Sequence, residues 1–136
     1  MQRVFHKHSS FFGLFLAVCL AVVAANPAPA QRRHTSDDRP YDTRLLRLSE
    51  ILGAIHYLRE LCGANEGQIW RKQMEDLVRV EGSTAIRRAI LAKGFNKGYR
   101  GYRRTYRACT DSAKTAVDRF MEEGEKISTL LIDQDR

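Results

Sequence analysis

Apolar residues recur at steps of three and four along almost the whole chain after residue 41, which is the spacing of amphipathic helices. Four such stretches can be separated. Their apolar positions are Leu45, Leu48, Ile51, Leu52, Ile55, Leu58 and Cys62 in the first, Ile69, Trp70, Met74, Leu77 and Val78 in the second, Ile86, Ile90, Phe95, Tyr99, Tyr102 and Tyr106 in the third, and Ala113, Val117, Phe120, Gly124, Ile127 and Leu131 in the fourth. The chain has no proline after Pro40 and no strand-like alternation of apolar and polar residues. The pattern therefore predicts an all-α domain over residues 41–136, built as a four-helix up-down bundle.

Residue types that favour helix ends divide these stretches. The predicted N-terminal caps are Asp42 or Thr43 for the first helix, Asn65 with Gln68 for the second, Ser83 for the third and Thr110 for the fourth. The predicted ends of the first three helices are Gly63, Gly82 and about Ala108.

The third stretch changes face near Gly94. Ile86 and Ile90 lie on a different side from the aromatic residues of 95–106, and glycine inside a helix costs about 1 kcal/mol relative to alanine. Either the helix is continuous and touches neighbours on two sides, or it bends or breaks near Gly94. We favour a continuous helix that can bend there. The three glycines Gly94, Gly98 and Gly101 share one strip, where a neighbouring backbone could approach closely.

The first thirty residues differ in composition from the rest. Residues 1–10 contain Arg3 and Lys7 and no acid, and the apolar run 11–25 is shorter than the roughly 20 residues that span a bilayer. Ala28 and Ala30 suit a signal-peptidase site, although cleavage after Ala25 is an alternative. The sequence thus predicts a secretory signal over 1–30, a periplasmic protein without a stable transmembrane anchor, and a polar, disordered leader over 31–40.

Two cysteines, Cys62 and Cys109, lie outside the predicted signal. An even pair in a small exported domain is typical of a disulfide. In an up-down bundle the first and third helices point the same way, so their C-terminal ends lie at the same end of the bundle. The predicted topology therefore agrees with a Cys62–Cys109 disulfide.

Basic residues dominate the third stretch. Removal of residues 1–30 takes away two bases and no acid, so the formal net charge falls from +7 to +5. Between Gly82 and Thr110 there are eight bases and no acid. Five of these bases lie opposite the tyrosines and form the basic stripe, which comprises Lys93, Lys97, Arg100, Arg104 and Arg107.

Three interpretations of the basic stripe stay open. It can bind an anionic envelope component. It can be a solvated face that acids of the fourth helix neutralise, these being Asp111, Asp118, Glu122 and Glu125. It can also meet an acidic ridge of a second copy in a homo-oligomer. The interleaved tyrosines suit stacking on bases, but such a stripe is more often part of a core, and export argues against nucleic acid as a partner.

A polar pocket of His56, Arg59 and Glu60 is the other candidate site. His56 and Glu60 are four residues apart, which is the spacing of a two-ligand metal face, but no further ligand pair accompanies them, so we expect no metal and no cofactor. Arg59 falls among leucines and needs a partner, with Glu50, Glu66 or a backbone carbonyl as candidates. No catalytic motif is present, so we expect a non-enzymatic module. The alternatives are an adaptor that docks another envelope protein in an apolar groove left by the short second helix, or an envelope hydrolase built on this pocket.

Two stretches carry a family resemblance, Leu45–Cys62 (LLRLSEILGAIHYLRELC) and Phe95–Thr110 (FNKGYRGYRRTYRACT), with Glu66 and Trp70-Arg71 between them. With their motifs L-G-x-x-H-Y-L-R-x-L-C and F-N-x-G-Y-R, they resemble a family of small secreted proteobacterial proteins catalogued as a domain of unknown function. The resemblance covers nearly all of the chain after the predicted signal. It implies export and paired cysteines, and it implies no activity, ligand or catalytic residue.

Overall fold

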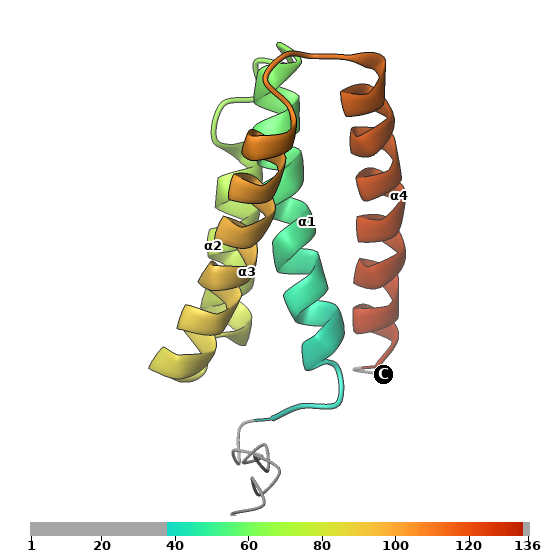
Figure 1. Cartoon of the computed structure of the whole chain (residues 1–136). Helices are drawn as coiled ribbons and strands as arrows, with labels where there is room; N and C mark the ends of the chain where they lie inside the picture. Colours follow the sequence, from blue (N-terminus) through green and yellow to red (C-terminus); the bar gives the residue numbers. More distant parts are fainter. Residues whose placement is uncertain (1–37, 135–136) are drawn as a thin grey trace, which may run out of the picture. The chain divides into compact units, whose positions relative to one another are not determined.

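The computed structural model describes residues 38–134, which form four helices and no strand. The helices are α1 (Asp42–Leu61), α2 (Ile69–Glu81), α3 (Ala85–Thr105) and α4 (Asp111–Asp133), and they alternate in direction along the chain (Figure 1). The predicted all-α up-down architecture is thereby confirmed. The predicted signal over 1–30, both cleavage positions and the leader as far as residue 37 lie outside the described residues.

Threonine caps set the N-terminal ends of α3 and α4. Thr110 Oγ1 accepts a hydrogen bond from the Ala113 N–H at 3.2 Å, as predicted for α4. The cap of α3 is Thr84, not Ser83, and its Oγ1 accepts from the Arg87 N–H at 3.1 Å. The helix also ends at Thr105 rather than near Ala108. Tyr106 is extended because its carbonyl accepts from the Tyr57 hydroxyl at 2.6 Å, where the chain turns towards Cys62.

The predicted caps of α1 and α2 are wrong. The N-cap of α1 is Tyr41, and Asp42 lies in the first turn with its carboxylate already bound by the Arg39 N–H at 2.9 Å. Asn65 has a left-handed backbone (φ 50°), so no capping box forms and α2 begins at Ile69. The predicted glycine after α1 is confirmed, because Gly63 has φ 72° and donates to the Glu60 carbonyl at 3.1 Å.

Helix α1 is the centre of the fold. It packs against α2, α3 and α4, and α2 also packs against α3, whereas α4 packs mainly against α1 and touches α3 where the rings of Phe120 and Tyr102 meet (Figure 1). The buried residues of α1 surround the helix: Leu45, Ser49, Ile51, Leu52, Gly53, Ala54, Ile55, His56 and Leu58. The apolar spacing predicted that only one face of this helix is buried. The buried part is wider, because the small residues between the leucines also face neighbouring helices.

Two clusters of buried side chains occupy different sides of α1. One joins α1 to α4 through Ile51, Ala54, Ile55, Leu58, Ala113, Ala116, Val117 and Phe120. The other joins α1 to α2 and α3 through Leu45, Leu52, Met74, Leu91 and Phe95. Tyr102 and Tyr106 are partly buried against the first cluster, which places the tyrosine face of α3 towards the core.

Helix α3 is continuous across Gly94, so the alternative of a break is excluded. At Gly98 the backbones of α1 and α3 are so close that a Cβ atom would overlap the carbonyl group of Glu50, and Gly53 faces the backbone of Phe95 in the same way. The predicted glycine strip is therefore confirmed at Gly98, and at Gly94 a Cβ atom would lie 2.9 Å from the Leu46 side chain and 3.3 Å from the Leu46 carbonyl oxygen. The prediction is wrong at Gly101, where a Cβ atom would meet nothing within 4 Å.

The predicted Cys62–Cys109 disulfide is present, with the two Cα atoms 4.9 Å apart. It joins the C-terminal cap of α1 to the segment between α3 and α4. The parallel course of α1 and α3 brings these two ends together, as the bundle topology required (Figure 1).

Candidate functional site

The cations of the basic stripe are all exposed. Lys97 donates to Glu50 Oε1 of α1 at 2.6 Å, and its side chain is still 71% exposed. Lys93, Arg100, Arg104 and Arg107 form no ion pair with any described carboxylate. Arg107 lies beyond the end of α3, so the helical part of the stripe runs from Lys93 to Arg104.

Neutralisation of this stripe by α4 has no support in the described residues. In the described residues no ion pair joins α3 to α4, and the two helices meet at the rings of Tyr102 and Phe120, on the tyrosine side of α3 and not at the basic stripe. Asp111 of α4 pairs with Lys114 of its own helix at 3.2 Å. The positive charge of α3 therefore faces outwards and is available to an anionic partner.

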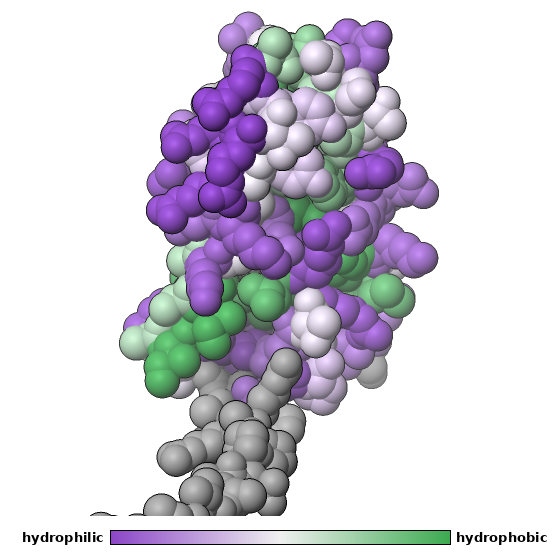
Figure 2. Space-filling model, in the orientation of Figure 1, coloured by the Kyte–Doolittle hydropathy of each residue, from purple (hydrophilic) through white to green (hydrophobic). Residues whose placement is uncertain are grey.

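The exposed face of α3 extends beyond its cations. Ile86 and Ile90, which we call the isoleucine pair, precede Lys93 at the same steps of four and three, so all lie on one side of the helix. They were expected to touch a second neighbour, but they are 68% and 50% exposed. Figure 2 shows the result, with hydrophobic surface over the N-terminal end of α3 and hydrophilic surface over its C-terminal half.

The predicted polar pocket of His56, Arg59 and Glu60 does not form an acid–base group. His56 is only 4% exposed and lies between the rings of Phe95 and Tyr99, each 5.8 Å away between centroids. Its Nδ1 has no hydrogen-bond partner. Glu60 is exposed and bonds to neither of the other two. With the imidazole enclosed, these side chains cannot act together on a substrate.

Arg59 instead pairs with Glu66, one of its three predicted partners. Its Nε donates to Glu66 Oε2 at 3.1 Å, and its Nη2 donates to the other carboxylate oxygen. Trp70 Nε1 also donates to Glu66, at 2.6 Å. The bonds from Arg59 and Trp70 hold the pKa of the Glu66 carboxyl below its usual value. This cluster ties the end of α1 to the start of α2.

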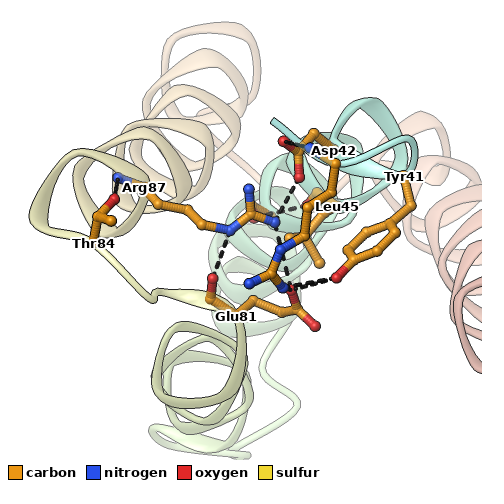
Figure 3. Close-up of polar contacts among 8 residues, drawn as sticks. Tyr41, Asp42, Leu45, Glu81, Thr84 and Arg87 are labelled. Atoms are coloured by element: carbon orange, nitrogen blue, oxygen red, sulfur yellow. Dashed lines mark hydrogen bonds and ion pairs between the residues drawn. The ribbon is translucent and has the colours of Figure 1, made fainter. Parts of the chain in front are cut away.

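A second charged cluster was missed by the sequence reasoning and lies where α1, α2 and α3 meet (Figure 3). We call it the Arg87 cluster; it comprises Arg39, Tyr41, Asp42, Glu81 and Arg87. Arg87 is only 7% exposed. Its Nη2 lies 2.5 Å from Asp42 Oδ1, and its Nε donates to the Glu81 carbonyl at 2.6 Å. A signal did exist, because Arg87 is four residues before the buried Leu91 and so belongs to the inward face.

Arg39 completes this cluster from the segment that precedes α1. Its Nη1 lies 2.8 Å from Glu81 Oε2 and 2.7 Å from the Tyr41 hydroxyl (Figure 3). Partial burial opposes ionisation of Asp42, but the hydrogen bonds from Arg87 and from the Arg39 N–H outweigh it, so the pKa of Asp42 is lowered. Every cation of the cluster faces an acid, which makes it a structural junction.

Arg87→Met is expected to lower the free energy of unfolding by about 2 kcal/mol at neutral pH, because it leaves Asp42 and Glu81 without their buried partner. Since the folded-state pKa of Asp42 is lowered, its contribution is present above the unfolded value of about 4 and is lost as the pH falls below it. Urea unfolding at neutral and acid pH measures both effects. Arg100→Met, at an exposed position, is the control and should change stability by less than about 0.5 kcal/mol. Equal stability of the two variants at neutral pH would contradict a structural role for the cluster.

An open apolar groove lies between α2 and α4, with α1 as its floor. Its volume is about 390 Å³, and its apolar lining is Leu45, Leu48 and Leu52 from α1, Leu77 and Val80 from α2, and Leu131 and Ile132 from α4. It forms because α2 and α4 do not contact each other. The groove expected beside the short second helix is therefore present.

In the described part of the chain, no three His, Cys, Asp or Glu side chains gather in a way that could hold a metal ion. None of the described helices combines the length and apolar character needed to cross a membrane.

The fold and the exposed side chains define a disulfide-linked, four-helix domain whose third helix carries a basic outer face. The chain belongs to the family described as "Protein of unknown function (DUF2385)", whose model matches residues 40–134. Neither the curated proteins nor the solved structures contain a match to this chain.

Proposed function

We propose that the protein is a periplasmic, non-enzymatic binding module that holds an anionic component of the cell envelope against the basic stripe of α3. The observation that carries this proposal is the set of exposed cations, Lys93, Arg100, Arg104 and Arg107, that no described carboxylate neutralises. Like charges three and four residues apart repel each other along a helix. An anionic partner that bridges them removes this repulsion and gains several charge-assisted contacts at once.

Export rests on two observations. The N-terminal thirty residues have the composition of a cleaved secretory signal. The disulfide is compatible with an oxidising compartment outside the cytoplasm. The absence of an acid–base group at His56 and Glu60 favours a binding role over hydrolysis.

A second candidate function is that of an adaptor that docks an apolar segment of another envelope protein. The groove between α2 and α4 favours it, since seven apolar side chains line an open volume of about 390 Å³. Salt separates the two functions. Ionic binding weakens steeply as salt rises, whereas apolar docking changes little.

The test uses long-chain polyphosphate as a soluble polyanion and measures its Kd for the exported chain, residues 31–136. Four phosphate contacts predict a loss of affinity of roughly 50-fold when salt rises from 50 to 200 mM. The stripe variant Lys93→Gln/Arg100→Gln/Arg104→Gln should bind at least tenfold more weakly and show a smaller salt dependence. Lys97 is left intact because it pairs with Glu50.

The matched control is Arg71→Gln/Lys72→Gln/Lys126→Gln, which removes the same charge from exposed positions on α2 and α4. It should keep most of the affinity. If it loses as much as the stripe variant, net charge and not the stripe binds the polyanion, and the proposed function is overturned.

A further inference from the structure

The exposed face of α3 combines cations with large apolar side chains, and binding of a soluble anion requires only the cations. Its C-terminal half presents cations, and its N-terminal end presents the isoleucine pair, 68% and 50% exposed. All of these positions follow one another at helical steps on one side of the same helix. The face is thus apolar at one end and carries lysine and arginine along the rest, and Figure 2 shows it as hydrophobic surface followed by hydrophilic surface.

Nothing within the described chain covers this face. Helix α3 packs on α1 and α2 through its opposite side, where Arg87, Leu91, Phe95 and Gly98 are buried, and α4 touches α3 at Tyr102, which also lies away from this face. Between Gly82 and Thr110 the sequence contains no acid that would repel an anionic surface. The helix is therefore held rigidly by the core while its outer face stays open.

A phospholipid surface with anionic headgroups fits both ends of this face. Cations of an interfacial helix lie among the phosphates, and adjacent large apolar side chains enter the boundary between headgroups and acyl chains. A soluble polyanion such as a nucleic acid or polyphosphate would use the cations and leave the isoleucines in water.

We propose that the anionic component is a membrane surface, on which α3 lies with Lys93, Arg100 and Arg104 on lipid phosphates and with Ile86 and Ile90 inserted beside them. This inference rests on the proposed function and specifies its partner. The contact is peripheral, since none of the described helices could span the bilayer.

The experiment is co-sedimentation of the exported chain with vesicles of phosphatidylcholine, alone or with about 30 mol% phosphatidylglycerol. Binding is expected only with the anionic lipid. The stripe variant defined above should bind more weakly by about fivefold for each base removed. Ile86→Ser/Ile90→Ser should reduce vesicle binding by about tenfold or more and leave polyphosphate binding unchanged.

The control for the isoleucines is Met121→Ser/Leu130→Ser on α4, where the side chains are 43% and 41% exposed. It removes a similar apolar area away from α3 and should bind vesicles as the wild type does. Because all four positions are exposed, both variants are expected to fold, and unfolding in urea verifies this.

The outcomes separate the inference from the function on which it rests. Polyphosphate binding without vesicle binding overturns the membrane inference and leaves the proposed function standing. Absence of both overturns both. Vesicle binding that is equal for wild type and Ile86→Ser/Ile90→Ser overturns the insertion of the isoleucine pair. A wild-type dimer that this variant converts to a monomer, measured by light scattering without vesicles, also overturns the inference, because a second copy then covers the pair.

Discussion

Gly98→Ala is expected to lower the free energy of unfolding by about 3 kcal/mol or more, the upper end of what overpacking a core costs. The new Cβ atom would overlap the carbonyl oxygen of Glu50 and lie 2.9 Å from its carbonyl carbon and 3.0 Å from the amide nitrogen of Ala54. These are backbone atoms of the central helix, so no side-chain rotation can relieve the overlap. Helices α1 and α3 must move apart, which loosens the packing of Leu91 and Phe95. Equilibrium unfolding in urea at neutral pH measures the loss.

The control for this variant is Gly101→Ala, three residues further along the same helix. Its Cβ atom would meet nothing within 4 Å. Because alanine is the better helix former, this variant should gain up to about 1 kcal/mol. If both substitutions change stability in the same direction, the close approach of α1 and α3 at Gly98 is contradicted.

Loss of the Cys62–Cys109 disulfide is expected to cost about 4 kcal/mol, which is the chain-entropy value for a cross-link between residues 47 apart. Small domains are stable by only about 5–15 kcal/mol, so this is a large share of the total. Cys62→Ser/Cys109→Ser and the reduced wild type should therefore unfold at much lower urea concentration than the oxidised protein. The hydrogen bond from Tyr57 to the Tyr106 carbonyl remains in both and keeps the native path of the chain available.

Thiol titration and intact mass of the protein recovered from the periplasm test the same bond in its native compartment. We expect no free thiol and a chain that begins at Gln31 or, for the earlier cleavage, at Asn26. Two free thiols would contradict a stable disulfide in the exported protein. A mass that still includes residues 1–30 would contradict the predicted signal cleavage.

Local signals predicted the helices well and their ends less well. Thr110 caps α4 as expected because its hydroxyl needs only the amide three residues further on. Asp42 suits the same role by residue type, yet its carboxylate is bound by Arg87 from α3, 45 residues away. A cap that a distant side chain takes over cannot be recognised from the neighbouring sequence.

The candidate site shows the same division. The cations of α3 could be placed on one outer face from their spacing alone. The exposure of Ile86 and Ile90 could not be predicted from the sequence, because apolar residues at helical spacing are more often packed against a neighbour. Arg87 was the reverse case, since a base in a basic run is usually solvated, and here it is buried against Asp42 and Glu81.

By itself, the sequence determined the helical class, the four segments and the outward basic stripe, because the spacing of apolar and basic residues along one helix is a local property. It also determined the pairing of Cys62 with Cys109, because an up-down topology brings those two helix ends together. The tertiary structure alone decided that α1 is central, that α4 packs mainly on α1, and that the outer face of α3 remains uncovered. These features depend on how closely two backbones approach, as at Gly53 and Gly98, and the spacing of apolar residues along one helix does not specify which distant helix will meet it.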